Sequence, residues 1–218
     1  MKYLGVPASG SQAGTTASRN RFGQYFRTRA IPVNPSTPQQ LVQRARMSTN
    51  AAGWRALTDT QRAGWLALGL MMTRTDALGQ VYDFNGFMAY CCINNNNLNA
   101  GNAIVADAPA VVTPPAILTA VITLTAAAMS IAYTATPLGA GARLFSFASP
   151  QQSAGRKFNG NYRLIAVSAA AAASPANIYA AYIARLGVPV VGTRIFFSLA
   201  TYQAGFIGAP FGASQVVV

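Results

Sequence analysis

The first 36 residues show no regular alternation of hydrophobic and polar positions. Serine and threonine fill much of this segment, and Pro32 and Pro35 lie near its end. Four glycines interrupt it, at Gly5, Gly10, Gly14 and Gly23. Glycine and proline are the strongest breakers of helix and strand patterns. We therefore predict an extended N-terminal arm over residues 1–36.

Residues 37–107 carry the signals of a small helical domain. Thr37 and Thr58 are each followed three residues later by glutamine, which is the pattern of a capping box at a helix N-terminus. Asn85 is a candidate N-cap for a third helix, and Gly101 is placed to end that helix. We predict helices over 38–54, 59–72 and 86–101, with a turn at Gly79 and a short extended piece at 81–83.

Hydrophobic side chains recur at helical spacing within this segment. In the second helix Trp65, Leu68 and Met72 follow the i, i+3, i+7 spacing of a buried stripe. Trp54 and Trp65 flank the turn between the first two helices, so we expect both to be core anchors. For the first helix we expect one face to be formed by Leu41, Ala45, Ser48 and Ala52.

The period changes to two in the C-terminal half of the chain, after a stiff proline-rich linker over 108–116. Seven short strands separated by turn residues are typical of a β-sandwich. We predict an α+β chain in which residues 117–218 form an all-β sandwich domain. The expected strands are 117–125, 129–136, 142–148, 162–168, 178–184, 193–201 and 214–218.

The composition adds a second level of information. Charged residues make up only 9% of the chain and hydrophobic residues 52%, whereas an ordinary soluble domain has roughly 25% charged residues. No stretch of 18 or more apolar residues occurs, so we expect no membrane span, and the N-terminus lacks the pattern of a secretory signal. A low-charge surface is typical of subunits that bury much of it against other proteins. We therefore expect a subunit of a larger assembly.

The same composition argues against an enzyme. The chain has no His and no Glu, and its only acids are Asp59, Asp76, Asp83 and Asp107. Imidazole is the usual general base and the commonest metal ligand, so we expect no catalytic residues, no metal site and no cofactor. We expect the adjacent Cys91 and Cys92 to be reduced structural thiols, since no His lies beside them to activate a nucleophile.

An asparagine run, Asn94–Asn97, stands at the end of the third helix. We expect a frayed helix end whose backbone is satisfied by side-chain amides. The alternative is a carbohydrate or metal site, although asparagine is a poor metal ligand without carboxylates.

Basic residues are concentrated in two blocks. Residues 1–62 carry nine Lys and Arg against one Asp, residues 63–107 one Arg against three Asp, and residues 108–218 six basic residues and no acid. Arginines interleaved with aromatic rings can bind carboxylates and apolar pockets of proteins, or phosphates and bases of nucleic acids. We favour protein partners over nucleic acid. The predicted partner-binding residues are Arg19, Arg21, Phe22, Tyr25, Phe26, Arg27, Arg29, Arg44 and Arg46.

Three segments carry a resemblance: NPSTPQQLVQRARM from residue 34, WRALTDTQRAGW at 54–65 and FNGFMAYCCINNNNLNAG at 84–101. Together with a proline-rich joint, they resemble uncharacterised structural proteins of phage and prophage virions. GTRIFFSLATYQAG at 192–205 resembles the penultimate strand and turn of fibronectin-III-like and immunoglobulin-like modules. The resemblance implies a virion structural role and supplies no catalytic residues.

We therefore expect a head accessory or decoration protein of a tailed phage, present in many copies or as a homo-oligomer. Its partners would be the major capsid protein or other virion proteins, and its location the virion, assembled in the host cytoplasm. Two alternatives stay open: a nucleic-acid-binding packaging protein that acts through the arginine-rich region, and a tail or surface adhesion module.

Overall fold

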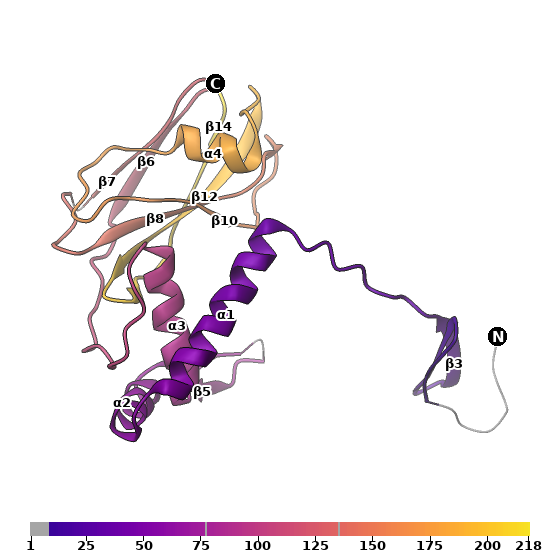
Figure 1. Ribbon diagram of the computed structural model, residues 1–218. Coiled ribbons are helices and arrows are strands. Elements are labelled where there is room, and N and C mark those ends of the chain that lie inside the picture. The colour runs from indigo at the N-terminus through magenta and orange to yellow at the C-terminus, as the bar shows by residue number, and fades with distance from the viewer. Residues whose placement is uncertain (1–8, 77, 135) are drawn as a thin grey trace. The chain divides into compact units, whose positions relative to one another are not determined.

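The computed structural model describes residues 9–76, 78–134 and 136–218, and these form a mixed α and β protein with antiparallel sheets (Figure 1). The chain divides into two compact units, Met1–Gln43 and Arg44–Val218. The boundary falls inside helix α1 (Pro38–Ala56). The predicted β segment and all of the predicted helical segment after residue 43 therefore lie in the second unit.

The first unit contains a small three-stranded antiparallel sheet where we predicted an extended arm. Strands β1 (Gly10–Gln12), β2 (Thr15–Asn20) and β3 (Gly23–Thr28) pair in the order β1–β2–β3. The prediction was wrong for these residues because the glycines that break a helical pattern also serve as turn residues between short strands. Ala13, at φ 49°, and Gly14 form the first turn, and Gly23 takes φ 114° at the second. Residues 1–8 of the predicted arm lie outside the described residues.

Three helices of the second unit follow the predicted capping signals. Thr58 caps α2 (Asp59–Leu70) with both hydrogen bonds of the capping box, and the Asn85 side chain accepts from Met88 N at the start of α3 (Gly86–Asn99). Thr37 and Gln40 form the equivalent pair before α1, at 3.2 and 3.4 Å. At the end of α3, Gly101 has φ 77°, and Gly101 N and Asn102 N donate to Leu98 O and Asn97 O. This is a Schellman motif, as expected for a C′ glycine.

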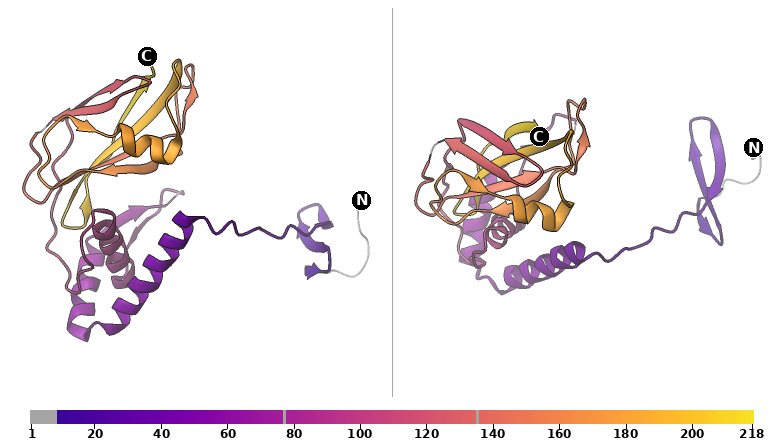
Figure 2. Two further views of the ribbon diagram at one scale, coloured as in Figure 1. Left: turned by 45° about the horizontal axis from the view of Figure 1, so that its top comes forward. Right: turned by 90° about the horizontal axis from the view of Figure 1, so that it is seen from above.

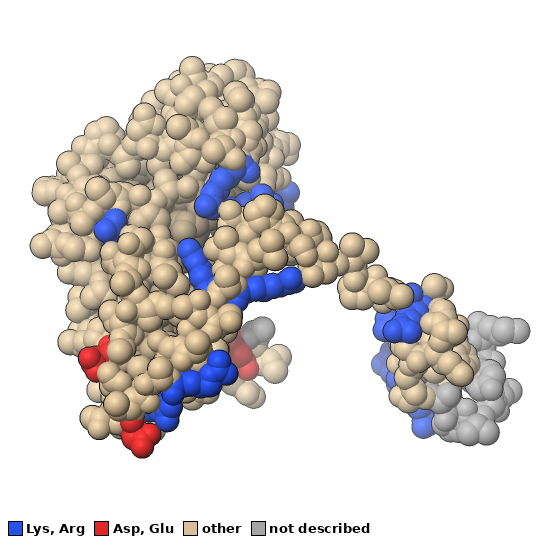
Figure 3. All heavy atoms as spheres, in the orientation of Figure 1, with Lys and Arg blue, Asp and Glu red and all other residues tan. Residues whose placement is uncertain are grey.

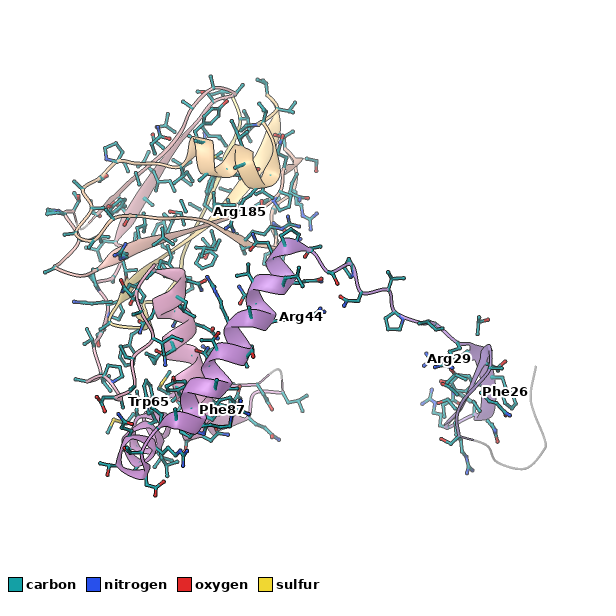
Figure 4. All side chains as sticks on the ribbon, viewed as in Figure 1. Phe26, Arg29, Arg44, Trp65, Phe87 and Arg185 are labelled. Atoms are coloured by element: carbon teal, nitrogen blue, oxygen red, sulfur yellow. The ribbon has the colours of Figure 1, made fainter. Side chains whose placement is uncertain are left out.

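The predicted tryptophan anchors do form a core between these helices. Trp65 is fully buried and packs edge-on against Tyr90 of α3, with ring centroids 5.2 Å apart. Trp54 is half-buried and contacts Tyr90 and Phe87 at 5.6 and 5.7 Å. Figure 4 shows Trp65 and Phe87 close to where α1, α2 and α3 meet. Leu68 is buried in the same core, and Met72 packs against it.

The prediction for the inner face of α1 was wrong. Leu41 is 52% exposed, whereas Asn50 is the helix residue that is buried. Asn50 Nδ2 donates to Asn95 Oδ1 at 3.0 Å, and Arg46 donates to Asn99 Oδ1 at 2.5 Å. Around Arg46 and Asn50 the face of α1 toward α3 is polar because α3 presents amides to it, and hydrophobic spacing cannot reveal such a face.

The connection between α2 and α3 forms a two-stranded hairpin. Strands β4 (Thr73–Thr75) and β5 (Val81–Asp83) are antiparallel, and β5 matches the predicted extended piece. At the tip, Asp76 Oδ1 accepts hydrogen bonds from Leu78 N and Gln80 N, and Gly79 takes φ 83°. Arg74 pairs with Tyr82 in the register.

Residues 117–218 form two antiparallel sheets. The larger sheet is built around the long strand β12, and β10–β8–β12–β13 is its main order, with β9 and β14 also paired to β12. The smaller sheet has the order β11–β7–β6. The strands are β6 (Thr119–Leu124), β7 (Met129–Thr134), β8 (Arg143–Ala148), β9 (Gln152–Ser153), β10 (Arg163–Val167), β11 (Ala176–Asn177), β12 (Thr193–Gln203), β13 (Phe206–Ile207) and β14 (Phe211–Val216). Six of the seven predicted strands therefore overlap observed strands. Residue 135, in the predicted strand 129–136, lies outside the described residues.

The two sheets share one hydrophobic core. Leu124 and Ile131 of the smaller sheet are buried in the same cluster as Leu144, Ile195 and Phe197 of the larger one. The antiparallel alternation along each strand places these side chains on the inner faces. Hydrophobic burial between the sheets is thus the main source of stability for this part of the chain.

The predicted all-β character fails at one element. Where a strand was expected over 178–184, the structure has helix α4 (Tyr179–Leu186), and both views of Figure 2 show it against the β segment. Tyr179, Tyr182 and Leu186 pack on the shared core at i, i+3, i+7 spacing, which overrides the apparent alternation. Tyr182 is fully buried, its hydroxyl donates to Ser149 O at 3.2 Å, and burial raises its pKa to about 12.

Candidate functional site

Most of the predicted partner-binding residues lie together on the small sheet of the first unit. Arg19 is in β2, Tyr25, Phe26 and Arg27 are in β3, and Arg29 follows β3 directly. Arg21 and Phe22 form the turn between the two strands. Figure 4 labels Phe26 and Arg29 on this sheet. We call the sheet formed by β1, β2 and β3 the basic sheet.

The strand register divides these side chains between the two faces of the basic sheet. Tyr25 lies opposite Ser18, and Arg27 lies opposite Thr16, so Tyr25 and Arg27 share one face. Phe26, opposite Ala17, lies on the other face. An open hollow of about 510 Å³ lies on the Phe26 side, lined by Phe26, Ala17 and residues of β1 and its turn. Each face therefore offers an aromatic ring.

The basic sheet has no hydrophobic core of its own. Every described residue of β1, β2 and β3 is exposed or half-buried, and Phe22 at the turn is 70% exposed. A small sheet needs a buried hydrophobic face for independent stability. We therefore expect the basic sheet to be stabilised by contact with another molecular surface that buries one of its faces.

The charges on the basic sheet are uncompensated. Among the described residues, the guanidinium groups of Arg19, Arg27 and Arg29 have no hydrogen-bond or ion-pair partner, while Arg21 stacks over the Phe22 ring at 4.6 Å. No acidic residue precedes Asp59 in the sequence. Figure 3 shows blue side chains and no red ones on the described part of this unit. Guanidinium groups in this setting match carboxylate or phosphate oxygens.

The remaining two predicted residues lie in α1, in the second unit. Arg44 is exposed on the helix (Figure 4). Arg46 is half-buried and bound to Asn99, so its side chain joins α1 to α3. The structure therefore gathers seven of the nine predicted residues on one sheet and places these two elsewhere.

The expectation of a frayed helix end at the asparagine run was wrong. Asn94, Asn96 and Asn97 lie within α3 and bind neighbouring elements through their side-chain amides, and we call these three residues the asparagine seam. Asn94 is fully buried and makes two hydrogen bonds to the backbone of Val105, at 2.9 and 3.2 Å. Asn96 donates to Gly205 O at 2.7 Å, and Asn97 Oδ1 accepts from the Tyr202 hydroxyl at 2.7 Å. The seam therefore ties α3 to the following loop and to the end of β12.

A sequence signal for this seam was available. Consecutive residues of an α-helix are 100° apart, so four asparagines in a row face every side of the helix. Polar side chains on all sides are expected when a helix is surrounded by other elements that present backbone groups. The run therefore indicates a central helix, and no ligand is needed to explain it.

Replacing Tyr202 by phenylalanine tests the seam. The change removes only the hydroxyl, which leaves the buried Asn97 Oδ1 without its donor and Asn102 Nδ2 without its acceptor. We expect the free energy of unfolding to fall by about 1–3 kcal/mol. Urea denaturation measures the change. The control is Tyr162→Phe on a partly exposed ring, and equal small losses in both variants would contradict the role of the seam.

The two cysteines lie beside a small hollow near the seam. Both are free thiols, as expected, and Cys91 is buried. Burial raises the pKa of Cys91, and it also raises the pKa of Cys92, where the nearby Arg74 partly offsets the effect. Cys92 and Arg74 line a hollow of about 330 Å³ together with Asn96 and Phe206. A thiol whose pKa is raised is a weak nucleophile at neutral pH.

The described residues contain neither a cluster of metal ligands nor a membrane-spanning helix. In residues 9–76, 78–134 and 136–218, no three Cys or Asp side chains gather as potential metal ligands. No helix of these residues is long and apolar enough to cross a bilayer.

No protein-family model, no curated protein and no solved structure matches this chain. Its function therefore has to be inferred from its own residues, and the basic sheet is the candidate site that they define.

Proposed function

We propose that the protein is a non-enzymatic structural subunit of a tailed-phage virion, a head accessory or decoration protein that stabilises the capsid. In this role the basic sheet binds neighbouring subunits. The observation that carries the proposal is a separate sheet with uncompensated arginines, exposed aromatic rings and no buried side chain. A surface of this kind becomes stable when a partner covers its rings and neutralises its charge.

The second unit would supply further contacts. Its two antiparallel sheets with a shared core support the interpretation of residues 117–218 as an immunoglobulin-like or fibronectin-III-like sandwich. The loop before β12 carries three exposed valines, Val188, Val190 and Val191, in a segment of the chain without acids. Apolar loops at the end of such a module suit lateral contacts with other proteins.

The low proportion of charged residues supports a crowded location. A free protein with 9% charged residues and this much exposed apolar surface would tend to aggregate. In a virion shell, assembled in the host cytoplasm, the same surface would be buried against the major capsid protein or other virion proteins. Low charge then lowers the desolvation cost of the contacts.

A photo-cross-linking residue in place of Phe22 tests the proposal in cells that make the full-length protein. Phe22 is exposed at the turn of the basic sheet, so the substitution leaves the pairing of β2 and β3 intact. We expect irradiation to yield covalent adducts with protein chains that sediment in large particles. Mass spectrometry of the adducts identifies those chains.

The matched control carries the same cross-linker at Phe158, an exposed ring in the second unit. Adducts at position 22 that contain nucleic acid, or no adducts above the level at position 158, would overturn the proposal.

One observation favours a second candidate function. Arg21 stacks on the Phe22 ring, and Tyr25 and Arg27 share one face, an arrangement that suits stacking on bases and binding of phosphates. A nucleic-acid-binding packaging protein would bind duplex DNA with an affinity that falls steeply as salt rises. Binding that is absent at low salt would exclude this candidate.

A further inference from the structure

We propose that the basic sheet of one copy binds the β4–β5 hairpin of a second copy of this chain. The inference rests on the proposed function, because it names the neighbour that the basic sheet contacts in the assembly. We call the described residues of the segment from the end of α2 through β5, residues 70–76 and 78–83, the acidic hairpin.

The acidic hairpin carries the charge that the basic sheet lacks. Two of the four acids in the chain, Asp76 and Asp83, lie on it, and both are exposed. In the described part of the chain neither carboxylate is within 4 Å of a Lys or Arg nitrogen. Segments 1–58 and 108–218 contain no acid at all. The basic sheet and the acidic hairpin therefore carry opposite charges, and the described residues of the chain leave both without an ion-pair partner.

The strand register places Arg74, the single arginine of the hairpin, on the opposite face from Asp83. Arg74 pairs with Tyr82 across the two strands, and its guanidinium carbon lies 5.4 Å from the centroid of the Phe84 ring. Asp83 lies opposite Thr73 and Val81 lies opposite Thr75, so Val81 and Asp83 point to the other face. Among the described residues, no Lys or Arg nitrogen lies within 4 Å of the Asp83 carboxylate on that outer face.

The acidic hairpin also carries exposed apolar side chains. Leu78 at the tip of the hairpin is 85% exposed and Val81 on its outer face is 68% exposed. Leu70 and Met71, at the end of α2, are also exposed. An apolar patch with acids on it complements a sheet that carries aromatic rings beside arginines.

The spacing of the two surfaces also matches. Tyr25 and Arg27 share one face of β3 at i, i+2, and Val81 and Asp83 share one face of β5 at i, i+2. Side chains at this spacing are about 7 Å apart along a strand. Arg27 can therefore meet Asp83 while the Tyr25 ring covers Val81.

Two further points favour the hairpin of another copy as the occupant. Two basic sheets cannot pair with each other, because each carries four arginines and no acid. Residues 29–37 link the basic sheet to α1 and contain Pro32 and Pro35, which stiffen this segment and oppose its folding back on its own chain. A contact between two different surfaces is heterologous, so it links copies head to tail.

A charge exchange in the full-length protein tests the proposal. The first variant is Arg27→Glu/Arg29→Glu on the basic sheet, and the second is Val81→Lys/Asp83→Arg on the acidic hairpin. All four residues are exposed, and far-UV circular dichroism checks that both variants fold. Sedimentation velocity over a range of concentrations, at about 0.05 M and about 0.5 M salt, measures self-association.

We expect the wild type to associate with rising concentration and less at high salt. Each variant alone should associate about tenfold or more weakly, because like charges then face each other. An equimolar mixture of the two variants, and a single chain that carries all four changes, should both regain association. The control Lys157→Glu/Arg163→Glu makes the same change in net charge as the first variant, at exposed positions, and should associate like the wild type.

Three results would overturn the inference: a wild type that stays monomeric throughout, variants that associate like the wild type, or folded variants that remain monomeric when mixed. The cross-link at position 22 separates this inference from the proposed function. Adducts with residues 70–83 of another copy support both, and isotope-mixed chains distinguish them from links within one copy. Adducts with other virion proteins alone would leave the proposed function standing and refute the inference.

Discussion

Replacing Trp65 by alanine should lower the free energy of unfolding by about 3–5 kcal/mol, the largest effect that we expect from a single substitution. Trp65 is fully buried between α2 and α3, and its ring packs on Tyr90. Its indole Nε1 also donates to Ala106 O at 2.7 Å. The change removes the ring and leaves a cavity and a carbonyl without its donor. Urea denaturation followed by far-UV circular dichroism measures the loss.

The neighbouring Leu66 provides the control, because it lies on the same helix and its side chain is exposed. Leu66→Ala should change the free energy of unfolding by less than about 1 kcal/mol. A loss for Trp65→Ala as small as that for Leu66→Ala would mean that the ring does not anchor the helical core.

A Gly205→Ala substitution should destabilise the protein by about 2–5 kcal/mol, because two costs combine. Gly205 takes φ 90° in the two-residue turn between β12 and β13, a conformation that disfavours alanine. A β-carbon there would also collide with Ile93 Cγ2 and approach Asn97 Oδ1 at 3.2 Å. The turn and α3 would have to separate, and the hydrogen bond from Asn96 to Gly205 O would be strained.

Gly192→Ala separates these two costs. Gly192 has a similar φ of 83°, but no atom lies within 4 Å of the position of its added β-carbon. It should therefore show the conformational cost alone, about 1–2 kcal/mol. Thermal denaturation of both variants gives the difference. Equal losses would contradict close packing of the β12–β13 turn on α3.

The helices were predictable because their signals are local. The Thr58 capping box, the Asn85 cap and the Gly101 stop each involve residues within one turn of a helix end, and the structure has all three. Local hydrogen bonds of this kind depend little on the rest of the chain. Most strands were predictable for a related reason, because alternation follows directly from having one buried face.

The errors arise where distant contacts decide the outcome. Residues 179–186 fit either a strand or a helix by hydrophobic spacing, and packing of Tyr182 on the core selects the helix. The inner face of α1 is set by the amides of α3, which are more than 40 residues away in the sequence. Neither contact can be read from a local pattern.

The candidate site was predictable in composition and not in shape. Arginines and aromatic rings between Arg19 and Arg29 predict a binding segment from the sequence alone. The division of Tyr25 and Phe26 between two faces depends on the pairing of β2 and β3, and glycine-rich segments specify such pairing weakly. The acidic hairpin was overlooked because Asp83 is unremarkable until the register places it on the opposite face from Arg74.

The hydrogen bonds of the asparagine seam also fix an order of events during synthesis. Asn96 and Asn97 of α3 bind Gly205 and Tyr202, which follow them by 109 and 105 residues. A ribosome adds about 5–20 residues per second, so these amides wait roughly 5–20 s for their partners. Until then α3 lacks the hydrogen-bond partners that Gly205 and Tyr202 provide. The basic sheet, near the N-terminus, has already left the ribosome by this time. The chain therefore exposes the basic sheet, its proposed binding segment, before the second unit has finished folding.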